Sequence, residues 1–209
     1  MTATMGRATA RAPLEEVLAL KAPLFESLLA QRKESRRQVI LDLGAASTAM
    51  LSLLGQFPCH VQIADLASDR EIQRLNAIPA SAELSALAAS LLPAHCAEEP
   101  VDTVLCWDLP NYLTPAAMSA LMTAVEARAC KGAIAHALVI YSERTMPDRP
   151  RRYVPMNDGR LVNHATPHSE IAAPRYSPEA LGLMMGNFRI DRARLLANGM
   201  QEFLLRFEP

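Results

Sequence analysis

Residues 38 to 47 read Gln-Val-Ile-Leu-Asp-Leu-Gly-Ala-Ala-Ser, and this segment limits the fold more than any other part of the chain. A continuous run of Val, Ile and Leu is typical of a parallel strand that is buried on both faces. Asp42 closes the run, and Gly44 lets the backbone turn tightly and approach a ligand. A helical pattern begins directly afterwards. The segment therefore predicts the strand, turn and helix of a nucleotide site.

A second short apolar run, from His60 to Asp65, ends in an acidic residue. Asp65 follows Gly44 by twenty-one positions. This is close to the spacing at which a carboxylate reaches a ribose hydroxyl in a βαβ unit. The chain thus presents a strand, a turn, a helix, a strand and an acid in the order that binds a ribose.

The turn after Asp42 lacks two of the glycines that a dinucleotide requires. A dinucleotide turn reads Gly-x-Gly-x-x-Gly, because the second glycine admits the pyrophosphate and the third lets helix and strand pack closely. Gly44 is followed instead by alanine, serine and threonine residues up to Thr48. The turn therefore suits a smaller ligand without phosphates.

At these positions the sequence resembles the class I S-adenosylmethionine-dependent methyltransferases, whose first motif runs acid-x-Gly-x-Gly-x-Gly. Asp42 and Gly44 match the motif, whereas Ala46 and Thr48 stand in place of its second and third glycines. Ser47 or Thr48 is also a candidate N-cap for the following helix. The resemblance implies S-adenosylmethionine as the cofactor. It also implies a set of cofactor-binding residues: Asp42, Gly44, Ala45, Ala46, Asp65, Leu66, Trp107 and Asp108.

Composition narrows the partners and the compartment. A chain of 209 residues, 50% of them hydrophobic, can bury one full core. A net charge of -1 disfavours nucleic acid, so we expect a small-molecule or protein acceptor. The four cysteines include no Cys-x-x-Cys pair, which disfavours a metal site and favours reduced thiols in the cytoplasm. No run reaches the roughly eighteen uncharged apolar residues of a membrane span, so no membrane partner is expected. The oligomeric state stays open.

The remaining segments alternate between helix and strand patterns, as an open α/β sheet requires. We expect residues 1–37 to form an N-terminal helical arm that Pro23 breaks or kinks, and residues 38–209 to form the domain. The third strand of the series is hard to find, so it is either short or lost. Two strand-like runs near the carboxyl end flank Asn198-Gly199, a strong hairpin signal. The prediction is a Rossmann-like three-layer sandwich, mostly parallel, that ends in an antiparallel hairpin like the sheet of the resembled family.

Residues 142–177 form a segment far longer than an ordinary connection, and it lacks helical periodicity. Asn157-Asp158-Gly159 lies between two strand-like runs and indicates a small β-hairpin flap. In the resembled family an insertion at this place covers the substrate. The resemblance therefore implies substrate contacts from this flap and from the loop after Trp107, and the candidates are Tyr112, Tyr153, His164 and Tyr176.

These features favour S-adenosylmethionine-dependent methyl transfer to a small molecule or a protein. In-line displacement at a sulfonium methyl needs mainly alignment, so no catalytic residue is implied. A non-catalytic methyltransferase-like binding or scaffold protein is the alternative, and Ala46, Thr48 and the indistinct third strand favour it. The missing glycines and the terminal hairpin disfavour a nicotinamide oxidoreductase. Trp107 and Tyr112 are equally compatible with core aromatics, and the flap with an ordinary surface feature.

Overall fold

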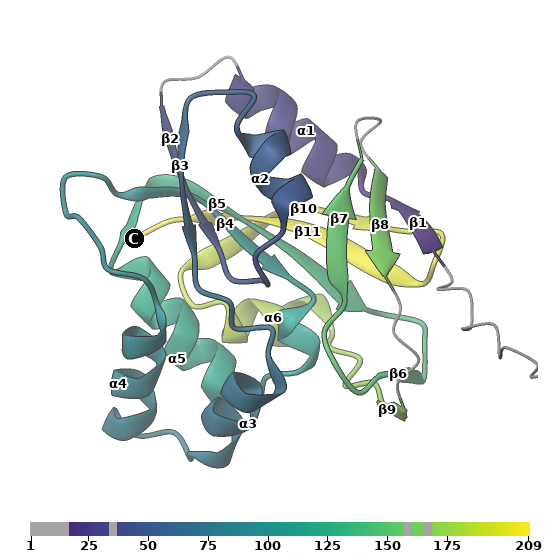
Figure 1. Cartoon of the computed structure of the whole chain (residues 1–209). Helices are drawn as coiled ribbons and strands as arrows, with labels where there is room; N and C mark the ends of the chain where they lie inside the picture. Colours follow the sequence, from purple (N-terminus) through teal and green to yellow (C-terminus); the bar gives the residue numbers. More distant parts are fainter. Residues whose placement is uncertain (1–16, 34–36, 157–159, 165–168) are drawn as a thin grey trace, which may run out of the picture.

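A six-stranded sheet forms the centre of the protein in the computed structural model, which describes residues 17–33, 37–156, 160–164 and 169–209 (Figure 1). Every residue of the two neighbouring interior strands β2 and β4 is buried, as the apolar run from Val39 to Leu41 predicts for β2. From one edge to the other, the strands are β10 (Phe188–Leu195), β11 (Met200–Phe207), β5 (Ala129–Ile140), β4 (Val101–Trp107), β2 (Gln38–Asp42) and β3 (Cys59–Ile63).

The sheet is parallel except at β11, which runs antiparallel to both of its neighbours, β5 and β10. β10 and β11 form a hairpin whose turn contains Asn198 and Gly199. Gly199 has a φ of +77°, a conformation that glycine adopts without steric cost. The predicted parallel sheet with a terminal antiparallel hairpin is therefore confirmed.

The third strand of the predicted series is lost rather than short. Residues 64–100, all of them described, contain the helices α3 (Asp69–Ala77) and α4 (Ala82–Leu91) and no strand. The segment from Ala94 to Pro100 is polar and lacks the apolar run from which a buried strand forms. β3 is consequently the outermost strand on this side of the sheet.

Helices cover both faces of the sheet and complete a three-layer sandwich (Figure 1). The helices α1 (Pro23–Lys33) and α2 (Thr48–Leu54) lie on one face. On the other lie α3, α4, α5 (Pro115–Glu126) and α6 (Pro178–Met184). Ser47 is the N-cap of α2, because its side chain accepts a hydrogen bond from the backbone N–H of Met50.

The segment before Pro23 differs from the helical arm that the apolar spacing predicts. Val17–Lys21 is a strand, β1, and it pairs antiparallel with β8 (Arg160–His164). Pro23 begins α1 instead of kinking a longer helix, because proline fits the first helical position and disfavours helix in the residue before it. Glu202 on β11 accepts hydrogen bonds from the backbone N–H groups of Leu24 (2.9 Å) and Phe25 (2.8 Å) and so caps α1.

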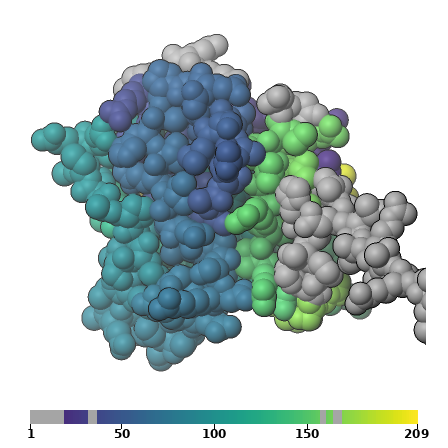
Figure 2. Space-filling view, in the orientation of Figure 1, coloured from purple at the N-terminus to yellow at the C-terminus, as the bar shows by residue number. Residues whose placement is uncertain are grey.

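The long segment after β5 contains the predicted hairpin. β7 (Arg152–Pro155) pairs antiparallel with β8, and β1 extends the pair to a three-stranded sheet, called the flap sheet below. The predicted turn at residues 157–159 lies outside the described residues. A smaller ladder joins β6 (Thr145–Pro147) to β9 (Glu170–Ala172). In Figure 2 the flap, in green, packs against the blue surface that includes α2.

Candidate functional site

The carboxyl ends of β2, β3 and β4 meet at one edge of the sheet, where open α/β folds bind their ligands. Backbone hydrogen bonds hold the three strand ends in register. Ala64 N–H donates to the carbonyl of Asp42 at 2.8 Å, and Leu66 N–H donates to that of Leu43 at 3.0 Å. Leu43 N–H in turn donates to the carbonyl of Leu105 at 3.0 Å. The acidic residues that follow these strands are thereby fixed relative to one another.

Asp42 occupies the centre of this edge and is 3% exposed. Its Oδ1 atom accepts hydrogen bonds from the backbone N–H of Gly44 (2.9 Å) and from the indole N–H of Trp107 (2.7 Å). Burial raises the pKa of the Asp42 carboxyl and outweighs the two hydrogen bonds, which lower it. Asp42 therefore organises the turn and the indole from within the protein.

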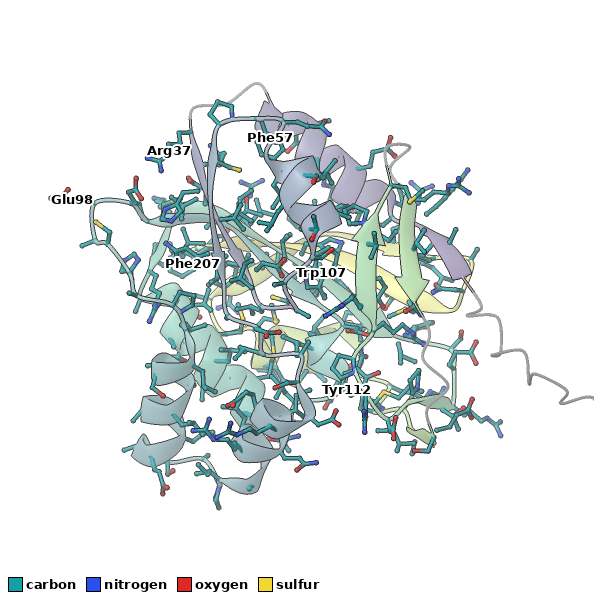
Figure 3. The ribbon with its side chains drawn as sticks, in the orientation of Figure 1. Arg37, Phe57, Glu98, Trp107, Tyr112 and Phe207 are labelled. Atoms are coloured by element: carbon teal, nitrogen blue, oxygen red, sulfur yellow. The ribbon has the colours of Figure 1, made fainter. Side chains whose placement is uncertain are left out.

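Trp107 ends β4 with a φ of +52°, a left-handed conformation that is strained for a bulky residue. A Cβ atom added at Gly44 would lie 2.5 Å from Trp107 Cδ1, so the indole lies directly against the glycine turn. The indole stacks on Tyr153 of β7, with ring centroids 5.6 Å apart and an angle of 16° between the planes. Phe25 and His136 contact its other sides. Figure 3 shows Trp107 between the sheet and the flap.

Asp108 follows Trp107 and connects this edge to the flap. Its Oδ2 atom accepts hydrogen bonds from the backbone N–H of Arg151 (3.1 Å) and the hydroxyl of Tyr153 (3.3 Å), and the guanidinium of Arg151 lies 4.0 Å away. Within the described residues Asp108 Oδ1 has no hydrogen-bond partner. Burial raises the pKa of Asp108 to about 6, against the opposing effects of Arg151 and the hydrogen bonds.

The space beside Gly44 is small in this closed arrangement. Its volume is about 10 Å³, which is room for about one water molecule. Trp107 and the flap residues Arg151, Arg152 and Tyr153 form part of its wall. The cavity is lined by Asp42, Gly44, Ala45, Ser47, Met50, Ala67, Trp107, Asp108, Leu109, Arg151, Arg152 and Tyr153.

Five of the eight residues proposed for the cofactor line this cavity: Asp42, Gly44, Ala45, Trp107 and Asp108. The other three do not. Ala46 is exposed to solvent, and so is Asp65 at the rim of the strand ends. Leu66 is 1% exposed and packs in the hydrophobic core, so only its backbone belongs to the edge.

The four proposed substrate residues are dispersed. Tyr153 lies at the site, against Trp107 and Asp108. The side chain of Tyr112 is nearly buried, and its hydroxyl donates to the backbone carbonyl of Arg149 at the base of the flap. Tyr176 lines a separate cavity of about 400 Å³ and does not join the site. His164 belongs to β8, but its side chain lies outside the described residues.

Sequence reasoning missed Arg151 and Asn163, both of the flap. Arg151 lines the cavity beside Gly44, and its backbone N–H binds Asp108. Several arginines follow one another in this segment, and nothing in their spacing distinguishes the one that turns inward. Asn163 lies directly opposite Tyr153 in the register of β7 and β8. The alternation of side chains along the hairpin is the signal that pairs them.

Other titratable groups carry structural roles. His136 is fully buried, and its Nε2 atom lies 3.1 Å from Glu202 Oε1, whereas its Nδ1 atom has no hydrogen-bond partner within the described residues. All four cysteines are free thiols, and burial raises the pKa of Cys106 to about 12. Among the described residues there is no cluster of His, Cys, Asp and Glu that could hold a metal ion. No described helix is both long and apolar enough to cross a bilayer.

Comparison with known proteins identifies the fold. No protein-family model and no curated protein sequence matches the chain. The chain is similar to the structure of an S-adenosylmethionine-dependent methyltransferase from Clostridium acetobutylicum ATCC 824, with a TM-score of 0.52 and 11% identity over 90% of this chain and 91% of that chain. The Burkholderia thailandensis 1,6-didemethyltoxoflavin-N1-methyltransferase aligns with a TM-score of 0.49 and 16% identity over 90% of this chain and 76% of that chain. The chain therefore has the fold of the class I S-adenosylmethionine-dependent methyltransferases.

Proposed function

We propose that the protein binds S-adenosylmethionine at the carboxyl edge of β2, β3 and β4 and transfers its methyl group to a small-molecule or protein acceptor. The observation that carries this proposal is the position of Asp65. The residue is exposed, follows β3 by two positions and has a φ of +51°, and the backbone N–H of the next residue donates to the carbonyl of Leu43, beside Gly44. Within the described residues its carboxylate makes no hydrogen bond, so both oxygens are available to ribose hydroxyls.

The similarity to the Clostridium acetobutylicum structure supports the proposal, because that protein is an S-adenosylmethionine-dependent methyltransferase with the same fold. The remaining question is whether the residues present fit the cofactor. The ribose side fits, since Asp65 is exposed and adjacent to Gly44 through the hydrogen bond between Leu66 and Leu43. The space beside Gly44 holds the indole of Trp107, so binding requires this ring and the flap to move.

When bound, S-adenosylmethionine supplies an electrophilic methyl group on a sulfonium sulfur. The chain's own residues then have two tasks. Trp107 and Tyr153, after moving to admit the cofactor and closing over it, would exclude water from the edge, which strengthens electrostatic interactions inside the site. Asp108, with a pKa of about 6, is largely ionised at neutral pH and can accept a proton through the hydroxyl of Tyr153, which already donates to it.

A second function has its own supporting observation. The indole of Trp107 against Gly44 is the arrangement expected of a methyltransferase-like binding protein whose cofactor space is filled by the protein itself. Such a protein would use the fold for interaction and not for catalysis.

A titration of the full chain with S-adenosylhomocysteine separates the two functions. For a cofactor site, we expect a rise in melting temperature equivalent to about 2.7 kcal/mol at a hundred times the dissociation constant. Asp65→Ala should remove most of this shift and leave the unliganded protein folded. Asp191→Ala, which changes an exposed aspartate on β10, serves as the matched control and should keep the shift. NADH should give none. Stabilisation by NADH and not by S-adenosylhomocysteine would overturn the proposal.

A further inference from the structure

A cavity of about 360 Å³, larger than the one beside Gly44, lies under the flap. Arg151 and Tyr153 line both this cavity and the small one beside Gly44, so these two residues form the wall between them. The new cavity is bounded by β1, β6, β7, β8, β9 and the turn of the terminal hairpin. It is therefore built largely from segments that a minimal α/β sheet does not need.

One side of the cavity is apolar. Leu20 of β1 and Met146 of β6 line it and are 7% and 4% exposed, respectively. Pro147 and Ala19 add further apolar atoms. A compact hydrocarbon group in this cavity would contact carbon on several sides and lose its own hydration.

One buried polar group of the cavity, the side-chain carbonyl of Asn163, is a hydrogen-bond acceptor without a donor in the described part of the chain. Asn163 is 6% exposed, and within the described residues its Oδ1 atom has no hydrogen-bond partner. Asn163 and Tyr153 are direct cross-strand neighbours, so their side chains lie on the same inner face of the flap sheet. A buried carbonyl oxygen without a donor is costly, and a ligand N–H would satisfy it.

Two carboxylates stand at the same cavity. Glu143 and Glu170 both line it, and in the described part of the chain neither makes a hydrogen bond or an ion pair. Among the described residues of the lining, the one cation is Arg151, and it lies 4.0 Å from Asp108, which offsets its charge. The free charge facing the cavity is therefore negative.

We propose that this cavity binds an amine carried on a compact apolar body, with the amino group toward Asn163, Glu143 and Glu170 and the body against Leu20 and Met146. An amine or ammonium group supplies N–H donors to Oδ1 of Asn163 and to the two carboxylates, which have no donor among the described residues. An acid of the same shape is repelled by the two glutamates. The further interpretation of this amine as the methyl acceptor rests on the proposed function, whereas the binding site does not.

Trp107 gives a direct signal for binding. It is the only tryptophan of the chain, and it stacks on Tyr153, which lines the cavity. The experiment is a fluorescence titration of the full chain, without any cofactor, with benzylamine, benzyl alcohol and benzoate. We expect saturable binding of benzylamine, binding of benzyl alcohol that is weaker by about tenfold or more, and none of benzoate. Benzoate binding as tight as that of benzylamine would overturn the proposal.

Matched variants test the contacts. Glu143→Gln with Glu170→Gln changes two exposed side chains and should weaken benzylamine binding by about tenfold, without altering the fold. Glu98→Gln makes the same kind of change in the loop before β4, on the side of the molecule away from the flap (Figure 3), and should leave binding unchanged. Asn163→Leu should weaken binding further, with circular dichroism as the check on folding. Unchanged affinity in the double glutamate variant would refute the site.

The outcomes separate this site from the proposed function. Binding of benzylamine without binding of S-adenosylhomocysteine would keep the site and reject the methyltransferase. Binding of S-adenosylhomocysteine without binding of benzylamine would keep the methyltransferase and reject the site. If both bind, transfer of a labelled methyl group from S-adenosylmethionine to benzylamine or to other amines of this class tests whether the ligand is the acceptor.

Discussion

The indole N–H of Trp107 donates a 2.7 Å hydrogen bond to Oδ1 of Asp42, and this contact holds the ring against Gly44. The glycine is therefore required by the protein's own tryptophan, since any Cβ at position 44 would collide with the indole. The same contact closes the edge of the sheet at which the fold binds ligands. Whether Trp107 acts as a movable gate or as a permanent filling decides between the enzyme and the binding protein.

Trp107→Phe is the variant that decides this point. Phenylalanine keeps an aromatic ring among Phe25, His136 and Tyr153 but removes the hydrogen bond to Asp42 and part of the volume above Gly44. For a gated methyltransferase we expect S-adenosylhomocysteine to bind about tenfold more tightly, measured by calorimetry. The reason is that moving the smaller ring away from Gly44 before the ligand binds costs less free energy. A flat titration, on variant protein that melts cooperatively, would favour the binding protein.

Glycine substitution in the turn should have little effect on cofactor affinity. Ala46 and Thr48 replace motif glycines, but both are exposed, and the indole of Trp107 is what narrows the space beside Gly44. We expect Ala46→Gly with Thr48→Gly to change the dissociation constant of S-adenosylhomocysteine by less than about twofold. The change should also lower the stability of the fold by up to about 1 kcal/mol, because Thr48 lies in α2. A large gain in affinity would show instead that these side chains crowd the ligand.

Asp108 should make stability depend on pH. Burial raises its pKa in the folded protein to about 6, above its ordinary value of 3.8, so the fold favours the protonated form. The stability that this residue contributes is fully present below pH 4 and is lost as pH rises to about 6. Between about pH 4 and pH 6 the free energy of unfolding of the wild type should fall by on the order of 3 kcal/mol relative to that of Asp108→Asn, measured by urea denaturation at several pH values. Asp191→Asn, an exposed control, should show no such trend. A difference in unfolding free energy between the wild type and Asp108→Asn that stays the same at every pH would contradict the prediction.

Glu202 should be a major source of stability, because it joins β11 to the start of α1. Its two carboxylate oxygens accept hydrogen bonds from the backbone N–H groups of Leu24 and Phe25, and the side chain is fully buried. Glu202→Ala leaves both donors unsatisfied and should cost roughly 3 to 5 kcal/mol in urea denaturation. Glu202→Gln keeps one acceptor and should cost less. The exposed control Glu208→Ala should change stability by less than about 0.5 kcal/mol, and a similar small effect at Glu202 would refute the anchoring role.

The central sheet was predictable from the sequence because its signals are local. Val39, Ile40 and Leu41 form a local apolar run, and the strand Gln38–Asp42 that contains them is buried along its whole length. The dipeptide Asn198-Gly199 set the terminal hairpin, since a glycine in the left-handed region matches the turn. Asp42, Gly44 and Asp65 followed the ends of their strands, so parallel pairing was enough to bring them to one edge.

Only the tertiary structure decided the rest, and the physical reason is that the deciding contacts join segments far apart in the chain. Val17–Lys21 has an apolar pattern compatible with a helix, and it is a strand because β8 offers its backbone groups a partner. The position of the Trp107 ring depends on Asp42, Phe25 and Tyr153 together, which no spacing along the sequence encodes. The sequence therefore determined that a ligand site forms at the carboxyl ends of β2, β3 and β4. The packing of the flap against these strand ends determined that the site is closed.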